Sequence, residues 1–103
     1  EYDKSLAAFL EIKMQDSLSP AINQSKINRF GYDYIRKNNF DLALEVFKIN
    51  VALYPTNSNV YDSLGEAYLL QKDTLNAEIN FKKALFINPE NRNSKLLLTK
   101  ITK

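Results

Sequence analysis

The feature that most constrains this chain is the match of the sequence with itself when it is shifted by 34 residues. Seven positions agree in kind, running from an apolar or aromatic residue to a closing proline. They are Ile27, Phe30, Gly31, Tyr34, Ala43, Phe47 and Pro55, which match Tyr61, Leu64, Gly65, Tyr68, Ala77, Phe81 and Pro89. A fixed period of this length indicates stacked copies of one small unit, none of which buries its apolar face alone.

Each copy has the pattern of two helices joined by a short turn. In the second copy Tyr61, Leu64 and Tyr68 recur at intervals of three and four, which places them on one helical face. A polar break at 71–73 follows, and a second apolar stripe then runs until Pro89 stops the helix. The first copy repeats this order, so the pattern predicts helices over 26–37, 40–53, 59–71 and 74–87.

Two residues inside these helices make specific packing demands. Gly65 costs about 1 kcal/mol relative to alanine in a helix, so we expect the next helix to approach it closely, with Ala77 as the facing small surface. Asn50 stands where the second copy has Ala84. We expect its amide to reach a backbone group or to be partly exposed, with Val51 filling the space.

The order of aromatic, large apolar, glycine, aromatic, alanine, phenylalanine and proline resembles the tetratricopeptide repeat (TPR) closely. The resemblance implies an all-α fold, a right-handed superhelical stack of antiparallel helix hairpins, the TPR-like α-solenoid, with about six helices. It implies one domain over 1–103, with the first repeat at 24–57 and the second at 58–91.

The two ends of the chain read as helices that cover the repeats. Residues 92–103 put Leu97, Leu98 and Ile101 on one stripe, with Arg92, Lys95, Lys100 and Lys103 facing water, which predicts a C-terminal capping helix. Residues 1–22 carry apolar side chains at helical spacing, namely Leu6, Phe9, Leu10, Met14 and Leu18. This segment is either a capping helix or a degenerate repeat.

The composition offers little chemistry to an enzyme. With no Cys and no His, the chain lacks thiol nucleophiles, histidine bases and the usual metal ligands, and no Ser has a Lys three residues later. Asp62 and Glu66 lie four apart like an acid and base pair, but nothing apolar adjoins them in sequence to shift a pKa. We expect no catalytic residue, metal or cofactor, and read the chain as a non-enzyme.

Charge and hydropathy limit the classes of partner that we expect for this chain. A net charge of +2 is too weak to indicate nucleic acid or an anionic membrane surface, and no run of about 18 apolar residues exists to cross a bilayer. We therefore expect a protein or peptide partner, no nucleic acid and no membrane. Self-association into a homo-oligomer through exposed repeat ends, or a stand-alone adaptor, are the alternatives.

The family resemblance implies that the first helix of each repeat lines a concave, peptide-binding surface. The side chains offset from the packing stripe are Asn28, Tyr32, Ile35, Arg36, Asp62, Glu66, Leu69 and Leu70. Some members clamp a peptide's C-terminal carboxylate with Lys, Asn and Arg. Here Asp62 and Glu66 would repel a carboxylate. We expect a segment of basic character instead.

A narrower resemblance concerns residues 25–91, whose run Tyr-Asp-Ser-Leu-Gly-Glu-Ala-Tyr at 61–68 and whose Asn50 look like the TPR tail of bacterial serine hydrolases of the beta-lactamase-related or esterase type. The resemblance implies a non-catalytic tail of a larger hydrolase, whose own catalytic domain is then a candidate partner. It implies a periplasmic or exported location. Without it the chain reads as cytoplasmic, and the sequence itself leaves the location open.

Overall fold

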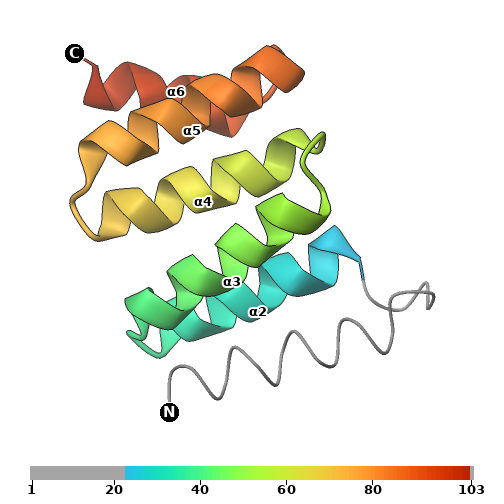
Figure 1. Ribbon diagram of the computed structural model, residues 1–103. Coiled ribbons are helices and arrows are strands. Elements are labelled where there is room, and N and C mark those ends of the chain that lie inside the picture. The colour runs from blue at the N-terminus through green and yellow to red at the C-terminus, as the bar shows by residue number, and fades with distance from the viewer. Residues whose placement is uncertain (1–22, 103) are drawn as a thin grey trace.

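A computed structural model describes residues 23–102, which form a stack of five α-helices. These are α2 (Gln24–Arg36), α3 (Phe40–Leu53), α4 (Ser58–Leu70), α5 (Thr74–Ile87) and α6 (Arg92–Ile101). Each helix packs against the next one along the chain, and α2 also contacts α4 (Figure 1). The all-α fold and the helical hairpins are confirmed, with helix bounds within two residues of those predicted. The helix predicted over 1–22 lies outside the described residues.

Local chemistry that repeats every 34 residues sets the ends of these helices. The side chains of Asn23, Asn57 and Asn91 accept hydrogen bonds from backbone N–H groups in the first turns of α2, α4 and α6. Asn39 and Asp73 cap α3 and α5 in the same way. An N-cap of this kind stabilises a helix by about 1 kcal/mol, so helix starts are encoded residue by residue.

Both helical glycines lie under a phenylalanine ring of the partner helix. A Cβ added to Gly65 would sit 2.6 Å from an atom of the Phe81 ring, and one added to Gly31 would clash with Phe47 in the same way. The predicted close approach is therefore confirmed. The three atoms nearest to that Cβ position on Gly65 belong to the Phe81 ring, and the expectation that Ala77 also faces Gly65 stays a prediction.

The core between the described helices is largely apolar, and Asn50 is its one fully buried amide. Phe47, Phe81 and Ile27 are fully buried, and the ring of Tyr32 meets Phe47 edge-on with centroids 5.1 Å apart. Asn50 is also fully buried, and its Nδ2 donates to the Gln24 carbonyl at 3.0 Å. The backbone contact expected of this amide is confirmed, and the alternative of partial exposure is not what occurs.

Helix α6 is the last helix of the described stack, and its role as a cap stays a prediction. Leu97, Leu98 and Ile101 are half-buried and its cationic residues Arg92, Lys95 and Lys100 are exposed, while Lys103 lies outside the described residues. The fully buried residue of α6 is Ser94, which the apolar stripe did not predict. At Lys95 and Thr99, α6 has polar side chains where the repeats have the aromatic or aliphatic residue and the glycine. Its outer face is therefore polar at the positions through which the repeats pack.

Candidate functional site

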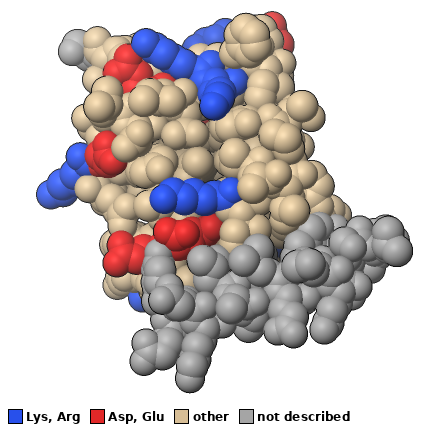
Figure 2. Space-filling model, in the orientation of Figure 1, with Lys and Arg blue, Asp and Glu red and all other residues tan. Residues whose placement is uncertain are grey.

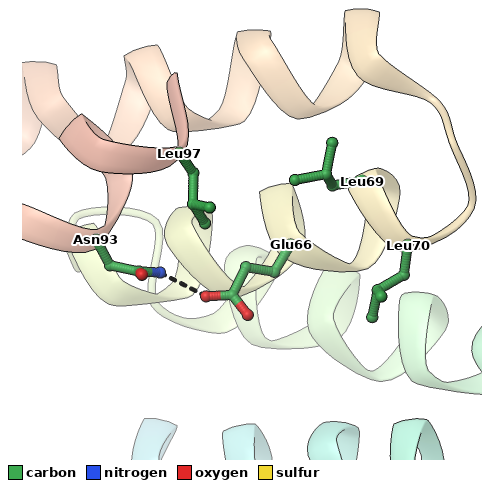
Figure 3. Close-up of a pocket in the computed structure, with 5 residues that line it drawn as sticks. All are labelled: Glu66, Leu69, Leu70, Asn93 and Leu97. Atoms are coloured by element: carbon green, nitrogen blue, oxygen red, sulfur yellow. Dashed lines mark hydrogen bonds between the residues drawn. The ribbon is translucent and has the colours of Figure 1, made fainter. Parts of the chain in front are cut away.

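A hollow of about 240 Å³ opens between α4 and α6 and has apolar walls with a polar floor (Figure 3). Three leucines supply the walls, and an acid and an amide supply the polar part. The lining residues are Glu66, Leu69, Leu70, Asn93 and Leu97. Leu69 and Leu70 close α4 at its C-terminal end, so the apolar part lies one turn beyond Glu66 along the same helix.

The carboxylates of Asp62 and Glu66 are fixed by hydrogen bonds from two neighbouring helices. From α6, Asn93 Nδ2 donates to Asp62 Oδ2 at 2.9 Å and to Glu66 Oε2 at 2.5 Å, and the Ser94 hydroxyl donates to Asp62 Oδ1 at 2.5 Å. From α2, the Tyr32 hydroxyl donates to Glu66 Oε1 at 3.2 Å. The acid pair therefore connects α2, α4 and α6.

The charge of the Glu66 carboxylate depends on its burial, its hydrogen bonds and the absence of a cationic partner among the described residues. Burial raises the pKa of Glu66, while its hydrogen bond from Asn93 opposes the shift. Burial also raises the pKa of the Tyr32 phenol to about 12, so that side chain stays neutral. Within residues 23–102 the ion pairs join Arg36 with Asp33, Lys48 with Glu45 and Lys82 with Glu78, so none neutralises Asp62 or Glu66.

The structure unites only part of the predicted concave set. Glu66, Leu69 and Leu70 line the hollow, and Asp62 and Tyr32 belong to its hydrogen-bond network. The remaining three residues, all on α2, do not line the hollow. Ile35 packs against the cluster that contains Phe47 and Leu64, Arg36 pairs with Asp33, and Asn28 is half-buried.

Three residues of α6 that shape the site were missed from the sequence: Asn93, Ser94 and Leu97. The available signal was the N-cap asparagine, which recurs at Asn57 and Asn91. It places α6 in register with α4, so the positions after it face the preceding repeat. The sequence already placed Leu98 opposite Leu64 in this register, but the concave set was drawn from the two complete repeats alone.

A second, shallower hollow of about 420 Å³ lies on the outer face of α6, lined by Arg92, Lys95, Leu96 and Thr99. Charged side chains of both signs are interspersed with wide uncharged areas on the face shown in Figure 2.

In the described part of the chain, no group of three acidic residues is placed to hold a metal ion. None of the five helices is long and apolar enough to cross a membrane.

Comparison with known proteins identifies the fold of this arrangement. No protein-family model and no curated protein sequence matches the chain significantly. Among solved structures it is similar to the first TPR of Spaghetti (RPAP3) bound to the HSP90 peptide SRMEEVD, with a TM-score of 0.73 and 20% identity over 98% of this chain and 77% of that chain. Residues 23–102 are therefore a stack of helical hairpins with the fold of a TPR domain.

Proposed function

We propose that this chain binds a segment of another protein in the hollow between α4 and α6. The observation that carries the proposal is an open site in which three leucines adjoin the carboxylate of Glu66, with Asp62 next to it through Asn93. No cation of the described residues pairs with either acid. Sites that bind protein segments pair apolar surface with a few fixed polar groups. The similar fold of a domain solved with a bound peptide supports the same reading.

The chemistry of the hollow favours a ligand that carries a Lys or Arg beside a leucine-sized side chain. The apolar group would replace water against Leu69, Leu70 and Leu97. The cation would lie against the free lone pairs of Glu66, since each of its oxygens accepts only one hydrogen bond. A C-terminal carboxylate at the same place would meet two negative charges within the site, so acidic tails are disfavoured.

Two synthetic peptides test this function by fluorescence anisotropy. One carries alternating Leu and Lys, and the other is the acidic peptide SRMEEVD. We expect the basic peptide to bind and the acidic one to bind at least about tenfold more weakly, which corresponds to about 1.4 kcal/mol. Tighter binding of the acidic peptide would contradict the proposal.

Variants of the lining locate the binding. Leu70→Glu places a charge on a wall side chain that is already exposed, so the fold should persist while binding is lost. Thr56→Glu, in the exposed loop between α3 and α4, is the matched control. The near-isosteric pair Asp62→Asn with Glu66→Gln should weaken binding and remove its salt dependence. Unchanged affinity in both site variants would exclude the hollow.

The wider setting of the chain is a separate proposal. The resemblance to hydrolase tails supports a module attached to a larger bacterial enzyme, whose catalytic domain would be a candidate partner. A gene that encodes a serine hydrolase domain immediately upstream of Glu1 would support it. A separate part of the TPR proposal is the single domain over 1–103, with repeats at 24–57 and 58–91 flanked by 1–22 and 92–103. The right-handed superhelix belongs to it as well, and small-angle X-ray scattering of longer chains tests both.

A further inference from the structure

Helix α5 presents a stripe of large apolar side chains on the side that faces away from the hollow. Leu75, Ile79 and Phe86 are 70%, 51% and 88% exposed, and they lie at positions i, i+4 and i+11 of one helical face. Lys82 fills the remaining place in the stripe, at i+7. None of these residues lines the hollow between α4 and α6.

The equivalent face of the first hairpin has a different composition. Helix α3 has the same length and the same place in its hairpin, and its residues at the matching positions are Asp41, Glu45 and Ala52. Two charged residues and one small one thus stand where α5 has Leu75, Ile79 and Phe86. The fold does not need large apolar groups at these positions, so their presence on α5 needs another explanation.

We infer that the stripe of α5 pairs with the same stripe of a second copy of this chain, in an isologous antiparallel dimer. In such a pair each residue meets its mirror position about a centre near Asn80. Leu75 then faces the neighbourhood of Phe86 in the second copy, and the two Ile79 side chains lie close to the axis.

Charge complementarity singles out a second copy as the occupant. Glu78 and Lys82 lie on the same side of the midline of the stripe, two residues before and two residues after Asn80, and form an ion pair at 2.8 Å within the helix. Antiparallel pairing brings Glu78 of one chain to Lys82 of the other, and Lys82 to Glu78. The four charges then alternate in sign around the interface, so the stripe is complementary to itself.

The size of the stripe sets the strength of the dimer. Stable interfaces bury about 800 Å² on each partner, whereas three side chains and their neighbours provide only part of that area. We therefore expect a weak, reversible dimer that forms only at high protein concentration.

Sedimentation equilibrium of the whole chain over a wide concentration range tests the dimer. The weight-average mass should rise toward twice the monomer mass as concentration increases. Phe86→Glu should keep the chain monomeric at every concentration, because the side chain is almost fully exposed and its loss leaves the core intact. A chain that stays monomeric throughout, or a dimer that survives this substitution, would overturn the inference.

Charge reversal distinguishes this geometry from other self-association. Lys82→Glu leaves two acids on each flank and Glu78→Lys leaves two bases, so each variant alone should fail to dimerise. An equimolar mixture of the two should associate again, because each acidic flank then meets a basic one. Glu45→Lys on α3 is the matched control and should leave the mass unchanged. A mixture that stays monomeric would contradict the dimer. Binding of the monomeric chain to anionic lipid vesicles through this stripe would also contradict it.

Discussion

The two helical hairpins join their helices at the same pair of positions, but the hydrogen bond runs in opposite directions. In the first hairpin, the Asn50 side chain on α3 donates to the Gln24 carbonyl on α2. In the second, the equivalent residues are Ser58 and Ala84, and the Ser58 hydroxyl on α4 donates to the Ala84 carbonyl on α5 at 2.7 Å. One polar side chain per hairpin is therefore enough to form the hydrogen bond between its two helices, and either helix can supply that side chain.

The two solutions differ in how completely they satisfy buried polar groups. Ser58 Oγ also accepts a hydrogen bond from Asn91 Nδ2 at 2.8 Å, which extends the connection to the N-terminus of α6. Asn50 Oδ1 is buried and has no hydrogen-bond partner. An unsatisfied buried acceptor costs about 1–3 kcal/mol, so the first hairpin holds a local defect that the second lacks.

The largest expected effect concerns the buried phenylalanine that each hairpin packs over a glycine, and it tests whether the two rings contribute equally to stability. Phe47→Ala and Phe81→Ala should each lower the free energy of unfolding by about 3–5 kcal/mol, since both rings are fully buried over a glycine. Urea denaturation followed by circular dichroism measures this loss. Phe86→Ala, on an almost fully exposed ring, is the control and should change little below the dimerising concentration. If Phe47→Ala left hydrogen-exchange protection in α4 and α5 intact, the hairpins would be independent units.

The next effect separates the two hydrogen-bond solutions. Ser58→Ala should cost about 1–3 kcal/mol, because it leaves the buried Asn91 Nδ2 without its partner and removes the side-chain hydrogen bond to the Ala84 carbonyl, which keeps only its backbone bond from Asn88. Asn50→Ala should cost less, because removing the amide also removes its unpaired oxygen. Denaturation of both variants in the same buffer gives the comparison. An Asn50→Ala loss as large as that of Ser58→Ala would show that the Asn50 oxygen is satisfied in solution.

A smaller effect concerns the turn within each hairpin. Asn38 and Lys72 both adopt left-handed backbone, with φ of 60° and 64°. Asparagine tolerates this conformation better than lysine, so Lys72→Asn should raise the free energy of unfolding by up to about 1 kcal/mol and Asn38→Lys should lower it similarly. Thermal denaturation of the reciprocal pair is sufficient. A destabilised Lys72→Asn would mean that the lysine side chain supplies a compensating contact.

The smallest effect concerns the groove, where the first hairpin has neutral Asn28 and Tyr32 and the second has Asp62 and Glu66. The folded-state pKa of Glu66 is raised above 4.5, so its ionisation opposes folding. Stability from this group is full below pH 4.5 and falls as the pH rises through the folded-state pKa. Glu66→Gln should therefore flatten the decline in stability above pH 4.5.

Denaturation series across this pH range measure that slope, with Glu90→Gln as a control on an exposed loop carboxylate. The control should retain the wild-type profile. A Glu66→Gln profile that coincides with wild type would show that the hydrogen bonds from Asn93 and Tyr32 stabilise the carboxylate enough to offset its burial.

Helix positions and the functional surface were not equally predictable. The 34-residue period located α2 to α5, because the helical caps and the glycine and phenylalanine pairs repeat with the same period. The site was recovered only from α4, through Glu66, Leu69 and Leu70. The polar residues of α6 that complete it break the apolar pattern, and a search for apolar periodicity passes over them.

The sequence by itself determined which segments are helices, where they begin and which faces pack, since caps and apolar spacing act over a few residues. Tertiary structure alone decided which long-range hydrogen bonds form: Asn50 to Gln24, Ser58 to Ala84, and Asn93 to the acid pair. It also decided that the Phe81 ring lies over Gly65. These hydrogen bonds form only at specific distances and angles between atoms of different helices, and the sequence period does not encode those distances or angles.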